Sequence, residues 1–450
     1  MLLKNCFLLA TLDGPPLSGV DLSVNKNRVG EIGKDLRTAP GERIIDCSSC
    51  VVIPGLVNTH HHFYQTLTRN LPGAQNAKLF DWLVYLYDIW KGIDEEAVYY
   101  SSLIAIGELL KTGCTLSTNH HYLYPERFEG DIMGLQCQAA AKLGIRFSPS
   151  RGSMSLGRKN GGLPPDSVVQ TEDEILEDSA SVIGRYHDPG EDAMVKVVLA
   201  PCSPFSVTAE NMRETAKLAR RHAVRLHTHL AETKDEEDYC REKFGMSPLA
   251  LMEKVDFVGE DVFFAHGVYF TDAELDKLAA TRTSICYCPS SNMRLGSGIA
   301  RVREMLDRGI RVGIGVDGSA SNDTSDMLGE LRNALLLQRV KYGASALKAD
   351  EAFMMGTVNG AEMLNFRHVG RIRKGWLADL AVFNVQRLEY TGSLSDPLAA
   401  LLFAGYSHQA EYTIVNGEVV VDRGTLVRQD EKEIIEKGNA IAAKLAAMHG

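Results

Sequence analysis

The chain has 450 residues, of which 45% are apolar and 24% charged, as in an ordinary globular enzyme with room for a barrel-sized domain and a smaller one. Its formal charge of −10 and its lack of any Lys/Arg-rich block make a nucleic-acid polymer a poor candidate partner. A small or neutral molecule fits this composition better.

The first residues, MLLKNCFLLATLDG, alternate into turn residues and lack a small-residue cleavage pattern, so we predict a first strand rather than a signal peptide. No stretch reaches the roughly 18 apolar residues that span a membrane. The nine cysteines include no repeated CxxC, which indicates reduced thiols and a cytoplasmic protein. We expect the Cys286 and Cys288 pair to be small core residues rather than a metal site.

Short strands separated by turn residues are predicted at both ends of the chain. The N-terminal ones cover 19–24, 28–33 and 43–46, and the C-terminal ones cover 378–383 and 412–421. Asn416-Gly417 is a strong hairpin signal within the last of these. Residues 1–55 and 366–430 are therefore predicted to build one small β-sandwich domain together.

Strands and helices alternate regularly through the middle of the chain. The predicted pairs are 195–200 with 208–222, 223–230 with 234–243, and 262–267 with 272–280, followed by strands that end at 285–288 and 312–317. This alternation favours a parallel barrel over residues 56–365, although periodicity alone leaves an open doubly wound sheet possible. An amphipathic helix is predicted over 431–450.

The segment 152–170 contains three glycines and two prolines after its first residue and is too long for a tight connection. A loop of this length in a compact domain is often a lid over an active site. We predict that role for it.

Three consecutive histidines occur in the stretch NTHHHFYQ, residues 58–65. In an extended strand, residues two apart share a face, so His60 and His62 can point to one place while His61 points elsewhere. An isolated HxH pair is weak evidence for a metal site.

Compatible side chains recur at the ends of later predicted strands. They are His227, His229 and Glu232 in HTHLAET, His266 in AHGV, and Asp317 in GVDG. At the carboxyl end of a barrel these groups converge. Nitrogen ligands with one carboxylate suit a zinc-like ion that keeps an open position for water.

Two other motifs resemble known binding signatures, but the surrounding sequence argues against both. The glycines of Gly313-Ile-Gly315-Val-Asp-Gly318 match GxGxxG but lie largely within a predicted strand, which argues against a dinucleotide site. Pro201-Cys202-Ser-Pro-Phe205 begins like the PCxxC of small zinc deaminases but lacks the second cysteine, which excludes that fold.

The stretches PGLVNTHHH, HTHLAET, AHGV and GVDGSASND together resemble the amidohydrolase superfamily, in particular its mononuclear deaminase and chlorohydrolase branch. The resemblance runs over nearly the whole chain. It implies an α/β fold, a distorted (β/α)8 TIM barrel with a small β-sandwich domain built from both chain ends.

The same resemblance implies one divalent metal ion, Zn²⁺ before Fe²⁺, bound by His60, His62, His229 and Asp317. Two-metal members hold a modified lysine at the end of the fourth strand, whereas the only lysine in this strand, Lys196, lies near its beginning. One metal is therefore expected.

Further roles follow from the resemblance. Glu232 matches the acid that shuttles protons, His266 matches the histidine that orients the attacking water, and Asp317 accepts a proton from that water in addition to binding metal. His61 is expected to be structural, and His227 is expected to support a ligand rather than to be one.

Candidate substrate contacts are Gln65, His121, Arg151 and Cys202. The Gln65 amide both donates and accepts, which matches the edge of a guanine-like ring. Arg151 is predicted to neutralise an oxo group or enolate, and His121 follows the predicted second strand. Trp82 and Trp90 lie on an aromatic insertion that either covers the substrate or seals the loop.

Within the branch, NTHHHFYQTLTR and APCSPFSVT are most similar to 8-oxoguanine deaminases. This implies hydrolysis of 8-oxoguanine at C2 to uric acid and ammonia, with isocytosine as a second substrate. Guanine deamination and triazine dechlorination are the alternative reactions, and a catalytically dead scaffold is the non-enzyme alternative. A homo-oligomer is expected because relatives commonly associate.

Overall fold

The computed structural model describes residues 1–448, and its centre is a sheet of eight parallel strands in the order β14-β13-β12-β11-β10-β9-β8-β7. These strands are β7 (Leu56–Asn58), β8 (Cys114–His121), β9 (Arg146–Ser153), β10 (Val198–Pro201), β11 (Arg225–Leu230), β12 (Val262–His266), β13 (Ser284–Tyr287) and β14 (Val312–Ile314). A hydrogen bond from Thr59 N to the Ile314 carbonyl, 2.9 Å long, links the first and last strands. The predicted (β/α)8 barrel is confirmed.

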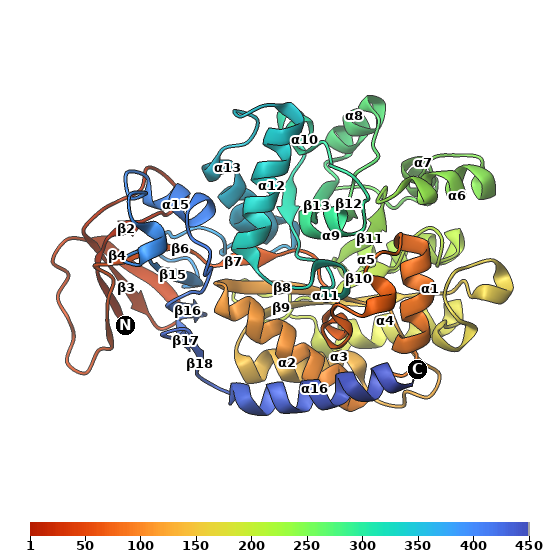
Figure 1. The fold of residues 1–450 in the computed structure, drawn as a ribbon, viewed down its shortest axis with the longest axis horizontal. Coiled ribbons are helices and arrows are strands. Elements are labelled where there is room, and N and C mark those ends of the chain that lie inside the picture. The colour runs from red at the N-terminus through yellow and green to blue at the C-terminus, as the bar shows by residue number, and fades with distance from the viewer. Residues whose placement is uncertain (449–450) are drawn as a thin grey trace.

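Helices follow the strands around the barrel (Figure 1). They are α1 (Leu79–Trp90), α2 (Glu95–Lys111), α3 (Ile132–Leu143), α4 (Glu172–Tyr186), α5 (Ala209–His222), α6 (Lys234–Phe244), α7 (Pro248–Lys254), α8 (Asp272–Thr281), α9 (Pro289–Arg294), α10 (Val302–Asp307), α11 (Ser319–Asn322), α12 (Met327–Tyr342), α13 (Ala349–Met354) and α14 (Gly360–Met363). Side-chain N-caps stabilise the first turns of several of these helices. Thr208 and Thr271, for example, each accept a backbone N–H from the first turn of the helix that they precede.

Two further sheets form the small β-domain at one end of the molecule (Figure 1). One contains β1 (Leu2–Cys6), β3 (Val20–Asn25), β4 (Arg28–Gly33) and β5 (Ile44–Asp46), and the other contains β2 (Leu8–Leu9), β6 (Cys50–Pro54), β15 (Leu380–Asn384), β16 (Tyr412–Val415), β17 (Glu418–Asp422) and β18 (Thr425–Leu426). Their inner faces share one apolar core. Asn416 and Gly417 both have positive φ, as the predicted hairpin turn requires.

Two barrel strands are shorter than the sequence predicts. β10 begins at Val198 rather than at 195, and β14 ends at Ile314 rather than at 317. Asp317 has φ +64°, a left-handed conformation that cannot continue a strand. The carboxylate therefore lies in a turn just beyond the sheet.

Helix α16 (Glu431–Ala447) runs along α2, and its end approaches α1 (Figure 1). The last two residues of the predicted helix, 449–450, lie outside the described residues. Helix α15 (Pro397–Phe403) falls within the predicted β-domain range but packs against α12 and α13 of the barrel. None of the helices in residues 1–448 is both long and apolar enough to cross a membrane.

A buried ion pair connects the barrel to the β-domain. The Arg146 guanidinium at the start of β9 donates to both carboxylate oxygens of Asp379, at 2.8 and 3.1 Å, and the two side chains are 0% and 1% exposed. Asp379 also accepts the backbone N–H of Asn416 at 2.7 Å. One carboxylate therefore holds β9, the residue before β15 and the hairpin turn together.

We predict that Asp379→Ala lowers the free energy of unfolding by about 3–5 kcal/mol, because it leaves the Arg146 charge buried without a partner. Urea denaturation followed by circular dichroism measures the change. Asp422→Ala is the matched control, since Asp422 pairs with Arg43 where both side chains are partly exposed, and its cost should be below about 1 kcal/mol. Equal effects of the two substitutions would contradict the assignment.

Candidate active site

Three histidines and one aspartate converge just beyond the carboxyl ends of the barrel strands. His60 and His62 follow β7, His229 lies near the end of β11, and Asp317 follows β14. The Nε2 atoms of His62 and His229 are 3.1 Å apart, and Asp317 Oδ1 lies 3.3 Å from Nε2 of both His60 and His62. The four predicted ligand side chains thus meet at one point.

The other ring nitrogen of each histidine has a fixed partner. Nδ1–H of His62 donates to the His120 carbonyl, and Nδ1–H of His229 donates to the Cys202 carbonyl, both at 2.6 Å. A carbonyl only accepts, so Nδ1 carries the hydrogen in both rings, and in a neutral imidazole this leaves the lone pair on Nε2. Burial lowers the pKa of the His229 imidazole, which keeps that ring neutral.

His227 fixes the third ring in the same way. Its Nδ1–H donates to the Phe263 carbonyl at 2.9 Å, so its Nε2 accepts from Nδ1–H of His60 at 2.8 Å. His60 Nε2 is then an acceptor, and it has no hydrogen-bond partner among residues 1–448. Burial lowers the pKa of His60 as well. His227 therefore fixes the orientation of the His60 ring, and the hydrogen bond to His60 occupies its own Nε2.

The arrangement of acceptors fits a divalent cation. Three imidazole lone pairs and a carboxylate oxygen face one another, and without a cation between them they would repel. In a tetrahedral zinc site with bonds of 2.0–2.1 Å the ligand atoms are about 3.3 Å apart, close to the spacings of 3.1 and 3.3 Å found here. Neutral imidazole is also the form of histidine that binds metal.

His61 points away from this centre. Its Nδ1 accepts the backbone N–H of His62 at 2.8 Å, and its Nε2 lies 3.0 Å from the Ser325 hydroxyl. It thus connects the turn after β7 to the segment before α12. This agrees with the structural role expected for His61.

Two more polar groups face the same centre. The Nε2 atom of His266 lies 3.6 Å from the Glu232 carboxylate and 3.9 Å from that of Asp317. Asn292 donates to His266 Nδ1 at 3.1 Å, so Nε2 carries the hydrogen. Burial, together with the charge of Asp317, raises the pKa of Glu232 well above its ordinary value, while burial lowers the pKa of His266 to about 3.

The backbone that carries Glu232 is held by a second acid. Glu236, in the first turn of α6, accepts the N–H of Ala231 at 3.1 Å and the N–H of Glu232 at 2.9 Å. Ala231 has φ +54°, so this turn is strained and these bonds stabilise it. Burial raises the pKa of Glu236 to about 7.

A small, partly enclosed cavity of about 30 Å³ lies over the convergent groups. Helix α1 supplies much of its roof through Leu79, Trp82, Leu83 and Tyr87. These residues recur every three or four positions and so share one face of the helix. Trp90 does not line the cavity. It lies in the core, where its indole N–H donates to the Thr68 hydroxyl.

Gln65 and Cys202, two of the four predicted substrate contacts, line this cavity. The Gln65 amide lies against Gly318, where a Cβ atom would come within 1.9 Å of Gln65 Oε1. Glycine at 318 therefore makes room for the amide. The Cys202 sulfur lies 4.0 Å from His229 Nδ1, and burial raises the pKa of the thiol to about 12, so it is neutral.

His121 and Arg151, the other two, do not line the cavity. His121 uses both ring nitrogens, accepting from Gln136 at 2.9 Å and donating to the Leu123 carbonyl at 2.8 Å. Arg151 pairs with Asp178 at 2.7 Å. The two residues are partners in the β8–β9 register and face the outer helices α3 and α4, which corrects their predicted placement.

The predicted lid differs as well. Segment 154–170 contains two short turns of 3-10 helix, η3 (Arg158–Asn160) and η4 (Asp166–Val168), and none of its residues lines the cavity. Helix α1 covers the site in its place. The aromatic insertion, rather than the glycine-rich loop, is the roof.

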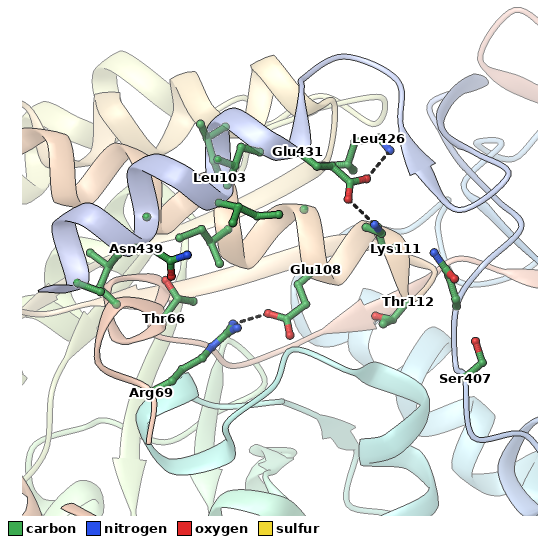
Figure 2. Close-up of a pocket in the computed structure, with 18 residues that line it drawn as sticks. Thr66, Arg69, Leu103, Glu108, Lys111, Thr112, Ser407, Leu426, Glu431 and Asn439 are labelled. Carbon is green, nitrogen blue, oxygen red and sulfur yellow. Dashed lines mark hydrogen bonds and ion pairs between the residues drawn. The ribbon is translucent and has the colours of Figure 1, made fainter. Parts of the chain in front are cut away.

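A second, open cavity of about 640 Å³ lies between α2, α16 and the 3-10 helix η1 (Phe63–Thr68). Figure 2 shows its two ion pairs, Arg69 with Glu108 and Lys111 with Glu431. It contains none of the predicted site residues. Arg69 also donates to Ser319 at 3.3 Å, which ties the element that carries Gln65 to the helix that follows Asp317.

Several side chains at the site have no role predicted from the sequence. Asn292 orients His266, and His120 stacks on the His229 ring with their centroids 4.7 Å apart. Tyr87 enters the cavity from α1. Strand alternation in β8 could have assigned His120 to the inner face, but no local pattern identifies Asn292 or Tyr87.

Comparison with known proteins gives consistent matches over the whole chain. Residues 51–420 match the amidohydrolase family. The chain is 44% identical to an 8-oxoguanine deaminase of Pseudomonas aeruginosa, with 99% of each chain covered, and 36% identical to a hydroxydechloroatrazine ethylaminohydrolase of a Pseudomonas species, with 95% and 92% covered. An atrazine chlorohydrolase of Arthrobacter aurescens, complexed with zinc, superposes with a TM-score of 0.94 at 29% identity, with 98% and 99% covered.

We predict that His227→Phe weakens divalent-metal affinity about 10- to 100-fold, because His60 loses the acceptor that fixes its tautomer and ring orientation. Competition with a chelator of known affinity measures the change. The control is His222→Gln, at an exposed position on α5, which should leave the affinity unchanged. An unchanged affinity in folded His227→Phe protein would show that His227 does not support the ligand.

Proposed function

Because the chain belongs to the amidohydrolase family, we propose that it is a metal-dependent deaminase that hydrolyses 8-oxoguanine to uric acid and ammonia, and that it also accepts isocytosine. The observation that carries this substrate is the 44% identity, over 99% of both chains, to an 8-oxoguanine deaminase. The walls of the cavity above the convergent acceptors are largely apolar and carry a few polar side chains, among them Gln65 and Glu232, as sites for small ring compounds do.

His60, His62, His229 and Asp317 are the residues that would hold the metal, and zinc is the ion that we propose. When bound, such an ion lowers the pKa of water towards roughly 7 and thereby supplies a hydroxide nucleophile at neutral pH. The zinc complex of the related chlorohydrolase supports zinc over iron.

The remaining steps are assigned to side chains of this chain. Asp317 accepts the proton of the attacking water, and Nε2–H of His266 donates a hydrogen bond to the oxygen that attacks C2. Glu232, protonated because of its raised pKa, gives its proton to the ring nitrogen beside C2. The proton taken up by Asp317 passes to the amine, which leaves as ammonia, and the hydroxyl proton of the intermediate returns to Glu232 as the carbonyl forms.

Gln65 and Cys202 are the substrate contacts that we propose among the four predicted. Gln65 Oε1 has no hydrogen-bond partner among the described residues, so it is free to accept from a ring N–H. The neutral Cys202 thiol adds a small, weakly polar wall. Arg151 and His121 are assigned instead to holding the outer ends of β8 and β9.

Triazine dechlorination is the alternative that a specific observation favours, because the chain superposes closely on an atrazine chlorohydrolase. Ammonia release distinguishes deamination from it, since a chlorohydrolase releases chloride. Guanine deamination would use the same C2 chemistry on a base without the 8-oxo group.

We expect zinc-loaded protein to release ammonia from 8-oxoguanine, with uric acid as product, at a higher kcat/KM than from guanine, cytosine or adenosylhomocysteine. A coupled ammonia assay and chromatography of the product measure this, and chloride release from a chlorotriazine is followed in parallel. Faster turnover of guanine, or chloride release alone, would overturn the proposed substrate. Protein without a near-stoichiometric divalent ion after metal-replete expression would favour the scaffold alternative.

We predict that Glu232→Gln retains the metal but lowers kcat about 10²- to 10⁴-fold, because the amide cannot deliver a proton. Steady-state kinetics and metal analysis on the same preparation check both parts. Glu242→Gln, at an exposed position of α6, is the control and should keep normal turnover. If Glu232→Gln were nearly as active as the unsubstituted protein, its role as proton carrier would be wrong.

A further inference from the structure

Two buried polar atoms at the cavity make no hydrogen bond of normal geometry within residues 1–448. The Gln65 side chain is 1% exposed and the Tyr87 side chain 0% exposed. By normal hydrogen-bond geometry neither Gln65 Oε1 nor the Tyr87 hydroxyl has a partner in residues 1–448, although the Tyr87 phenol interacts with the Tyr122 side chain, and both residues line the cavity. A buried polar group without a partner costs about 1–3 kcal/mol. Such groups in a catalytic cavity are expected to bind the substrate.

The fold brings Tyr87 to this place by a separate route from the catalytic residues. It lies on α1, which is inserted between β7 and β8, whereas the groups proposed for chemistry lie at strand ends. Leu79, Leu83 and Tyr87 are four residues apart and face the cavity together. Tyr87 is thus a single hydroxyl on an otherwise apolar roof.

The two groups have complementary hydrogen-bonding character. Burial raises the pKa of the Tyr87 phenol well above its ordinary value, so it remains neutral and able to donate. Gln65 Oε1 accepts. A donor and an acceptor in one small cavity match a carbonyl oxygen beside a ring N–H, which is the lactam edge of an oxo-substituted base.

Other hydroxyls in the cavity are less suited to this role. Ser321 already donates to the Gly318 carbonyl and accepts from Ser291. The Tyr122 ring stands edge-on to His62, with their centroids 5.1 Å apart, and its hydroxyl interacts with the Tyr87 and Tyr64 phenols, so its replacement would disturb both a proposed metal ligand and the Tyr87 hydroxyl. Tyr87 is the donor whose replacement leaves the metal ligands untouched.

We propose that Tyr87 determines specificity for lactam bases, its hydroxyl donating to the carbonyl oxygen of the base while Gln65 Oε1 accepts from the adjacent ring N–H. This inference rests on the proposed function, since it assumes that a cyclic amidine lies in the cavity. It extends that function by naming the residue that separates oxo-substituted bases from their analogues without the oxo group.

The test compares isocytosine with 2-aminopyrimidine, which keeps the amidine fragment but lacks the carbonyl and the ring N–H. Dissociation constants are measured by calorimetry in zinc-loaded Glu232→Gln protein, with and without Tyr87→Phe, and kcat/KM is measured with Glu232 intact. Tyr87→Phe should weaken isocytosine binding about 10- to 100-fold and change 2-aminopyrimidine binding by less than about twofold. The kcat/KM for 8-oxoguanine should fall by a similar factor.

Tyr287→Phe, which alters a buried tyrosine of β13 outside the cavity, is the matched control and should change neither dissociation constant. An equal loss for both ligands in Tyr87→Phe, or no loss for either, would overturn the inference. If protein with Tyr87 and Glu232 intact deaminates neither isocytosine nor 8-oxoguanine, the proposed function fails first. Deamination with unaltered selectivity in Tyr87→Phe would refute the role of Tyr87 alone.

Discussion

Repulsion between like acceptors is the constraint on which the site depends. Three imidazole lone pairs and one carboxylate face one another at about van der Waals contact or closer. With the hydrogen of each neutral ring on Nδ1, none of the three Nε2 atoms can donate a hydrogen bond to another member of the group. They stay together because each imidazole is anchored by its other nitrogen. The anchors are the His120 and Cys202 carbonyls and the His227 ring, all fixed by neighbouring strands. A divalent cation is the group that turns this repulsion into attraction.

The hydrogen bonds that close the barrel therefore also position the residues of the site. Asp317 donates its backbone N–H to the His60 carbonyl, and Asn58 accepts the N–H of Val316. These bonds join the turn after the last strand to the turn after the first, in the gap that the sheet itself leaves open. The left-handed conformation of Asp317 is held within this network. Unfavourable local geometry at the ligands is offset by cooperative hydrogen bonding around them.

Much of this centre could be predicted from the sequence because residue alternation is local. His60 and His62 share a face, and groups that end successive parallel strands meet at one edge. The same rule, applied to β8 and β9, would have placed His121 and Arg151 on the outer face, since they are register partners. Their polar side chains suggested contact with a substrate, but their positions in the strands direct them away from the cavity.

The rest depends on tertiary contacts that carry no local pattern. Asn292 reaches His266 from the helix that follows β13, and Tyr87 reaches the cavity only because α1 folds back over the barrel. The predicted lid failed for a related reason. The length of a loop indicates that it could reach over an active site, but it does not show which segment does. Here residues of α1 line the cavity, and no residue of the glycine-rich segment does.

In the proposed function, the groups for chemistry and those for selectivity occupy different parts of the chain. The groups assigned to bond making lie at strand ends, where the barrel fixes them, whereas Gln65 lies on η1 and Tyr87 on α1. Gly318 links the two sets, because the absence of a side chain there lets the Gln65 amide rest beside the turn that carries Asp317. A substitution on η1 or α1 can change which base is bound without disturbing the ligand set. Relatives of this chain are named for different substrates, and such a separation is one physical route by which a single fold can serve several of them.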